Sequence, residues 1–217
     1  MTLTSLIQKN KIFMSLFFIW LIACSALLLV INKGDETLFC ELNRNKFLDI
    51  FFSFWTNTGE GLFFVAFTII LSMYKFRYAI LSIIIFSASG LFGQFLKKII
   101  YGPVPRPSKF FENIQKIKGV DGVEMHSVFS FPSGHTITAF ALFTFIAIIS
   151  PNKYGFFWLI FAVLTAFSRI YLCQHFLIDT FAGSAIGTIF CITFWIWASN
   201  WKWLQNEKLN RGFLTKK

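Results

Sequence analysis

The sequence predicts an all-α fold: a six-span transmembrane helical bundle with one short interfacial helix. Of the 217 residues, 56% are hydrophobic and only 14% are charged, whereas soluble domains are closer to half apolar and a quarter charged. The apolar residues lie in long blocks, and about 20 apolar residues in succession can cross a bilayer as a helix. No internal repeat or linker divides the chain, so we expect a single integral-membrane domain over 1–217.

Six apolar blocks are candidate spans. The first is too long for the core of a typical signal peptide and is followed by no small-residue cleavage site, so we expect it to be retained. The second, fourth and fifth are short unless polar residues at one end, Glu60 among them, are included, which indicates functional groups set into the membrane edge. The blocks lie near 12–31, 57–74, 78–97, 133–150, 154–172 and 178–199.

Two segments between the blocks have their own character. Segment 43–55 is rich in Phe and Leu among polar residues and predicts the short helix at the membrane interface. Segment 109–127 is polar with scattered Gly and predicts an exposed loop that could meet a lipid head group. Glu124 and His126 are candidates for that contact, with ordinary solvated loop residues as the alternative.

The distribution of basic residues predicts the orientation. An even number of spans puts both termini on one side. The short segments on that side carry ten of the 20 Lys and Arg with one acid, Glu207, while the other ten share the opposite side with nine acids. The density in short loops predicts cytoplasmic termini for a multi-pass protein of the cell (inner) membrane. Because the basic residues flank apolar blocks, the net charge of +10 indicates membrane topology and no nucleic-acid partner.

The four cysteines show neither a CxxC pair nor metal-ligand spacing. Cys24 and Cys191 fall inside apolar runs, where cysteine behaves as a small hydrophobic residue. Cys40 and Cys173 could meet outside the membrane, and a disulfide between them is one possibility.

Ionisable residues gather at one end of the predicted bundle. Polar groups at membrane depth are costly and are functional candidates by default. Simple alternatives exist for each: a helix-capping Ser133, a snorkelling lysine, or a satisfied histidine at a helix start. All of the following fall on the same side of the six-span arrangement: Lys97, Lys98, Arg106, His135, Arg169, His175 and Asp179.

The spacing within this group predicts a chemical site. His175 and Asp179 are four residues apart and share one helix face, so the carboxylate can accept the proton of one imidazole nitrogen and leave the other free. A short reversal between the last two spans would bring Arg169 beside His175. Three prolines in 103–107 force an extended path that holds Arg106 near the membrane edge.

The remaining residues supply an anion site. Ser133, Gly134 and the free N–H groups that open the fourth span form a helix N-terminus suited to a phosphate. Lys98, Arg106 and Arg169 can hold phosphate oxygens. With His175 and a second histidine, His135, this is what phosphoryl transfer through a histidine nucleophile and a separate acid requires.

Three stretches resemble the blocks of the type 2 phosphatidic acid phosphatase family, in the same order: "KIIYGPVPRP", "PSGH" and "SRIYLCQHFLID". They cover 97–179. The second and third fit fully. The first departs, because seven residues separate Lys98 from Arg106 and eight separate Lys97 from it, one or two more than is usual in the family. We assign the lysine to Lys98, with Lys97 as the alternative.

The resemblance implies roles for the site residues. His175 would form a phosphohistidine, Asp179 would fix its tautomer, and His135 would protonate the leaving oxygen. No metal and no cofactor are implied. The phosphoryl oxygens would be bound by Lys98, Arg106, Ser133, Gly134 and Arg169.

The resemblance further implies a membrane lipid phosphatase, since six spans argue against the soluble haloperoxidase branch of the family. Its partners would be membrane lipids and a lipid phosphate substrate, for which undecaprenyl diphosphate, phosphatidylglycerophosphate, phosphatidic acid and lipid A are candidates. Two other functions stay open at this point: a lipid-to-lipid phosphotransferase, and a non-catalytic transporter or scaffold. The sequence does not select the substrate or the oligomeric state.

Overall fold

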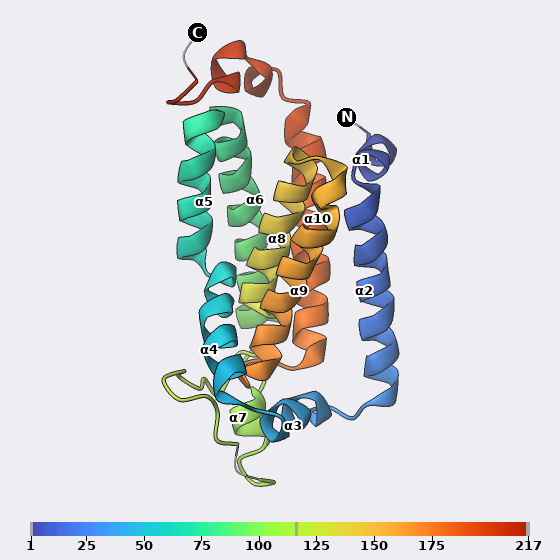
Figure 1. The fold of residues 1–217 in the computed structure, drawn as a ribbon, viewed down its shortest axis with the longest axis vertical. Coiled ribbons are helices and arrows are strands. Elements are labelled where there is room, and N and C mark those ends of the chain that lie inside the picture. Colours follow the sequence, from blue (N-terminus) through green and yellow to red (C-terminus); the bar gives the residue numbers. More distant parts are fainter. Residues whose placement is uncertain (1, 116, 216–217) are drawn as a thin grey trace.

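The structure is a computed structural model that describes residues 2–115 and 117–215, and no strand occurs among these residues. Its long helices run side by side along the long axis of the molecule (Figure 1). The predicted all-α bundle is therefore confirmed. These helices are α2 (Lys11–Val30), α5 (Gly61–Tyr74), α6 (Phe76–Phe95), α8 (Gly134–Ile149), α9 (Gly155–Tyr171) and α10 (Leu177–Ser199).

Shorter elements close the two ends of the bundle. Both chain ends lie at one end, and α3, α4, α7 and the long loop before α8 lie at the other (Figure 1), which we call the site end. A π-helical turn, η2 (Leu96–Ile100), extends α6. The other short elements are α1 (Leu3–Lys9), α3 (Asp35–Leu42), α4 (Lys46–Trp55), η1 (Thr56–Gly59), α7 (Pro107–Phe110), η3 (Asn152–Tyr154), η4 (Trp203–Gln205) and η5 (Glu207–Asn210).

All six predicted blocks are helical, although they differ in length. Four helices are long and apolar enough to cross a membrane: α2, α6 with η2, η3 with α9, and α10. Helix α4 with η1 would form a fifth span together with α5, from which it is bent by 59°. Helix α8 is shorter, with 16 residues. The predicted helix in 43–55 is present as α4, but it leads into α5 through this bend. That all six cross the bilayer stays a prediction.

Helix α8 forms the centre of the bundle, and 12 of its 16 residues are buried. Two glycines of α10 let the two helices approach closely. A Cβ at Gly183 would come within 2.9 Å of the Ser133 carbonyl oxygen, and one at Gly187 would overlap the backbone of Ile137. Small residues spaced four apart are a common means of close helix packing in membranes. The contact fixes the start of α8 against the first turns of α10.

Cys173 shapes the turn between α9 and α10. The sequence has no Gly or Pro there, and the structure makes the reversal with Cys173 in the left-handed region, at φ 53°. The thiol accepts a hydrogen bond from Arg44 Nη2 at 3.1 Å. All four cysteines are buried and free, so the disulfide considered between Cys40 and Cys173 is not formed.

Candidate active site

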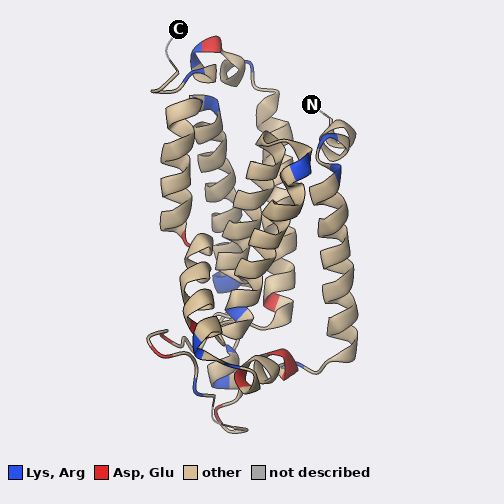
Figure 2. Cartoon of the chain, viewed as in Figure 1, with Lys and Arg blue, Asp and Glu red and all other residues tan. Residues whose placement is uncertain are grey.

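The candidate site residues come from five segments that meet at the site end. Basic and acidic residues are concentrated at the two ends of the bundle, with some inside it toward the site end (Figure 2). His135, at the start of α8, has four ionisable neighbours close enough to act on its charge. They are contributed by the end of α6, the loop before α8, the end of α9 and the turn before α10: Lys97, Arg106, Arg169 and His175.

His175 and Asp179 form a buried pair, with each side chain only 2% exposed. His175 Nδ1 lies 3.4 Å from Asp179 Oδ2. That oxygen also accepts hydrogen bonds from Ser130 Oγ at 2.5 Å and from the Phe176 backbone N–H at 2.9 Å. A carboxylate in this place holds the proton on Nδ1 and leaves Nε2 free. Burial, together with the charges of Arg106, Arg169 and Lys97, holds the pKa of His175 well below its usual range, so the imidazole is neutral.

Arg169 lies directly beside His175, as the spacing predicts. Its carbonyl oxygen accepts hydrogen bonds from the backbone N–H groups of Gln174 at 2.9 Å and His175 at 3.1 Å. Its guanidinium donates from Nη1 to Thr56 Oγ1 at 2.6 Å. The buried Nε has no hydrogen-bond partner in the described part of the chain. Buried donors are seldom left without an acceptor, so this nitrogen marks a place for one.

Arg106 is held in place by the loop that carries it. Its Nε donates to the carbonyl of Val128 at 2.9 Å, and its Nη1 donates to both the backbone carbonyl and Oε1 of Gln174 at 3.1 Å. Gln174 in turn donates from Nε2 to the carbonyl of Glu124 at 2.8 Å. Gln174, which directly precedes His175, therefore connects the turn before α10 to the long loop. An isolated glutamine gives no signal in the sequence that would have singled it out.

The structure places Lys97, and not Lys98, at the site. Lys97 is buried and lines the pocket described below, whereas Lys98 is exposed and does not line it. The reason is the π-helical turn over Leu96–Ile100. A π turn takes up an extra residue and shifts which side chains face inward, so the side chain that faces the pocket is that of Lys97, the alternative to Lys98.

The start of α8 leaves two backbone donors free. Ser133 caps the helix, since its Oγ accepts from the Thr136 N–H at 3.4 Å, and its own N–H donates to the carbonyl of Asp179 at 3.1 Å. The N–H groups of Gly134 and His135 have no acceptor within the helix, as is usual in a first turn. A Cβ at Gly134 would meet nothing within 4 Å, and both residues line the pocket described next.

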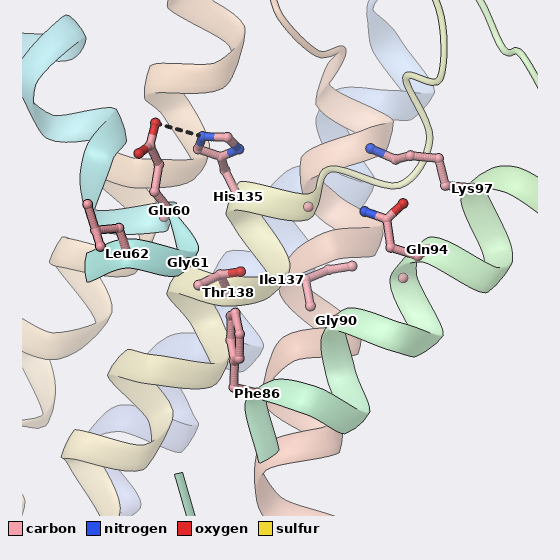
Figure 3. A pocket seen from close by; sticks show the side chains of 13 residues that line it. Glu60, Gly61, Leu62, Phe86, Gly90, Gln94, Lys97, His135, Ile137 and Thr138 are labelled. Carbon is pink, nitrogen blue, oxygen red and sulfur yellow. Dashed lines mark ion pairs between the residues drawn. The ribbon is translucent and has the colours of Figure 1, made fainter. Parts of the chain in front are cut away.

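A pocket of about 490 Å³ opens beside this helix start. Figure 3 shows the ring of His135 between Glu60 on one side and Lys97 on the other. His135 Nε2 lies 3.8 Å from Glu60 Oε1. His175 does not line the pocket. The lining combines glycines and apolar side chains with a few polar ones: Gly59, Glu60, Gly61, Leu62, Phe86, Gly90, Gly93, Gln94, Lys97, Gly134, His135, Ile137 and Thr138.

Two further residues considered from the sequence lie outside this group. Glu124 and His126 are largely exposed and lie 3.8 Å apart, Oε1 to Nδ1, on the long loop. Only the backbone carbonyl of Glu124 is connected to the site, because it accepts the hydrogen bond from Gln174.

The charges of the site do not balance among themselves. Lys97, Arg106 and Arg169 are 8%, 9% and 6% exposed, and none of them forms an ion pair within the described residues. The buried carboxylate of Asp179 is shared between His175, Ser130 and a backbone N–H. Buried charges without a partner are strongly unfavourable, so the site suits an anion. Among the described residues, no three His, Cys, Asp or Glu side chains are placed to hold a metal ion.

Comparison with known proteins gives one family and one fold. The model of a family described as the PAP2 superfamily matches residues 75–203. LpxE from Aquifex aeolicus superposes with a TM-score of 0.66 and 23% identity, over 76% of this chain and 94% of that one. A transmembrane PAP2 type phosphatidylglycerolphosphate phosphatase from Bacillus subtilis superposes with a TM-score of 0.60 and 23% identity, over 89% of this chain and 98% of that one. No curated protein matches the sequence.

Proposed function

The chain belongs to the PAP2 superfamily and is a membrane phosphatase, and we propose that it removes phosphate from a lipid phosphate or diphosphate through a phosphohistidine on His175. One observation carries the proposal: three buried cations without ion pairs surround a buried neutral histidine. A phosphoryl group supplies the missing negative charge, and its oxygens match the guanidinium geometry.

The residues divide the reaction between them. Nε2 of His175 attacks phosphorus, and an N–P bond forms as the bond to the leaving oxygen breaks. His135 gives a proton to that oxygen. Water then attacks phosphorus, His135 takes a proton from it, and the N–P bond breaks to release inorganic phosphate. Asp179 keeps the Nδ1 proton of His175 in place throughout.

Binding of the transferred group is assigned to Lys97, Arg106 and Arg169, with the N–H groups at the start of α8. These donors would surround the non-bridging oxygens, where charge is greatest in the transition state. Ser133 and Gly134 serve by shaping the helix start. The unpartnered Nε of Arg169 supports this assignment, since it already lacks an acceptor.

A lipid is the substrate class that best fits the surroundings of the site. The pocket beside His135 combines apolar side chains and glycines of α5, α6 and α8 with five polar residues, and its apolar part suits the first part of a lipid tail. The Bacillus subtilis neighbour is named as a phosphatidylglycerolphosphate phosphatase, which supports this class without selecting a member. Undecaprenyl diphosphate, phosphatidylglycerophosphate, phosphatidic acid and lipid A are the candidates.

We further propose that the site end faces the outside of the cell (inner) membrane and that both termini are cytoplasmic. The density of basic residues in the short segments at the terminal end supports this orientation. A membrane-impermeant reagent should label a cysteine placed in the 108–131 loop in intact cells, and labelling only after lysis would overturn it.

The decisive experiment measures phosphate release from a panel of these lipids in detergent. We expect release by the wild type and near-complete loss in His175→Ala, whereas the exposed His126→Ala serves as a matched control and stays active. Retained activity in His175→Ala would remove the nucleophile. Release that depends on an added acceptor lipid would indicate a phosphotransferase instead.

A further inference from the structure

We propose that Glu60 is a positioning residue for His135, and that its carboxylate holds the Nε2 proton of the imidazolium so that the Nδ1 proton is presented to the leaving oxygen. The inference rests on the proposed function and adds a residue to it. Figure 3 shows the Glu60 carboxylate beside the His135 ring, with the second ring nitrogen toward the side of Lys97. The distance between Nε2 and Oε1 is 3.8 Å.

The position of Glu60 is built into the fold. The residue lies at the break between η1 and α5, where the chain bends by 59°. Gly59 packs directly on α8 and α9, because a Cβ there would come within 2.7 Å of the His135 carbonyl oxygen and 2.9 Å of Thr165 Cγ2. Thr58 Oγ1 lies 2.7 Å from Thr165 Oγ1. The backbone before Glu60 is thus fixed against the helices that carry His135 and Arg169.

Glu60 supplies negative charge beside His135, where the other neighbouring ionisable groups are basic. The groups that face His135 from the other elements are Lys97, Arg106, Arg169 and His175, and none of them is negative. Asp179 is committed to His175, Ser130 and the Phe176 N–H. Glu60 is the one carboxylate among the residues that line the pocket. A general acid must carry its proton before the reaction, and among the residues that line the pocket only Glu60 has a charge opposite to that of an imidazolium.

The proton count is consistent with this role. The imidazolium holds two protons, one on each nitrogen. Nδ1 releases its proton to the leaving oxygen, while the Nε2 proton stays beside Glu60. In the second step the same Nδ1 accepts a proton from the attacking water, which returns the ring to its starting state. The site then contains two carboxylate–histidine pairs. Asp179 orients the nucleophile His175, and Glu60 orients the acid His135.

The test compares Glu60→Gln on two substrates that differ in their need for an acid. A lipid phosphate releases an alkoxide that must be protonated, whereas p-nitrophenyl phosphate releases a stable phenolate. We expect kcat to fall about 10- to 100-fold for the lipid, with little change in KM, and far less for p-nitrophenyl phosphate. Formate should restore part of the activity to Glu60→Ala. Glu112→Gln, which changes an exposed glutamate on the loop, is the matched control.

A second comparison separates positioning from a structural role. In a His135→Ala background, Glu60→Gln should cause no further loss of lipid hydrolysis, since the group it positions is gone. An equal loss on both substrates, a further loss in the His135→Ala background, or a change confined to KM would each overturn the proposal. If the wild type releases phosphate from neither substrate, the proposed function fails first, and the two failures are therefore distinguishable.

Discussion

Replacing Asp179 with asparagine tests the nucleophile pair directly. The change keeps the size of the side chain but removes the charge from an atom that accepts from Ser130 Oγ, the Phe176 N–H and His175 Nδ1. An amide that donates to Nδ1 would move the ring proton to Nε2, the atom that must attack phosphorus. We expect kcat to fall about 10²- to 10⁴-fold, which is about 2.8 to 5.6 kcal/mol at about 1.4 kcal/mol per tenfold change.

The assay is steady-state phosphate release in detergent, together with the unfolding midpoint of each variant. KM should change little, because Asp179 does not line the pocket. Asp49→Asn is the matched control: Asp49 accepts a hydrogen bond from the Tyr171 hydroxyl at 2.7 Å, away from the reacting atoms. A folded Asp179→Asn protein with at least half of the wild-type kcat would refute the tautomer argument, and a rise in KM alone would assign Asp179 to substrate binding.

Three other predictions follow from the described contacts. Lys97→Ala should lower kcat/KM at least about 10-fold, as for a lost charged hydrogen bond, while Lys98→Ala should stay within about twofold; the reverse result would restore Lys98. Gly187→Leu should lower the free energy of unfolding, measured in a denaturation series, by about 1–3 kcal/mol, because the side chain would overlap α8. Gly90→Ala, with nothing within 4 Å of the added Cβ, should leave the free energy of unfolding unchanged. Because the pKa of His175 is depressed in the folded protein, the unfolded chain binds a proton at a higher pH than the folded protein does. The free energy of unfolding should therefore fall as the pH drops below about 6.5, by at most about 1.4 kcal/mol per pH unit. His175→Gln should remove that part of the pH dependence of the unfolding midpoint.

Much of the fold could be predicted because the sequence separates apolar blocks from polar segments sharply. Each of the six blocks corresponds to a helix, since a helix in lipid satisfies its own backbone groups whatever its neighbours are. The i,i+4 spacing of His175 and Asp179 needed only local geometry. Arg169 came beside His175 because the connecting turn is short.

Other features depend on contacts that spacing does not contain. The inward position of Lys97 follows from a π turn, which has no marker in composition. Ser130 and Gln174 each act on a residue more than 40 positions away, so their roles appear only once the loop has closed on the turn before α10. The pairing of Glu60 with His135 likewise requires the bend that leads into α5.

The close seam between α8 and α10 limits how the active site can open. The Ser133 N–H is bonded to the Asp179 carbonyl, and Gly183 leaves no room between the two helix starts. His135 and His175, the proposed acid and nucleophile, are therefore carried by two closely packed helix starts, and separating these helices would break the geometry that the proposed reaction needs. The pocket walls formed by α5 and α6 lie outside this seam, so substitutions there can alter the entry of substrate without disturbing the alignment of the two histidines.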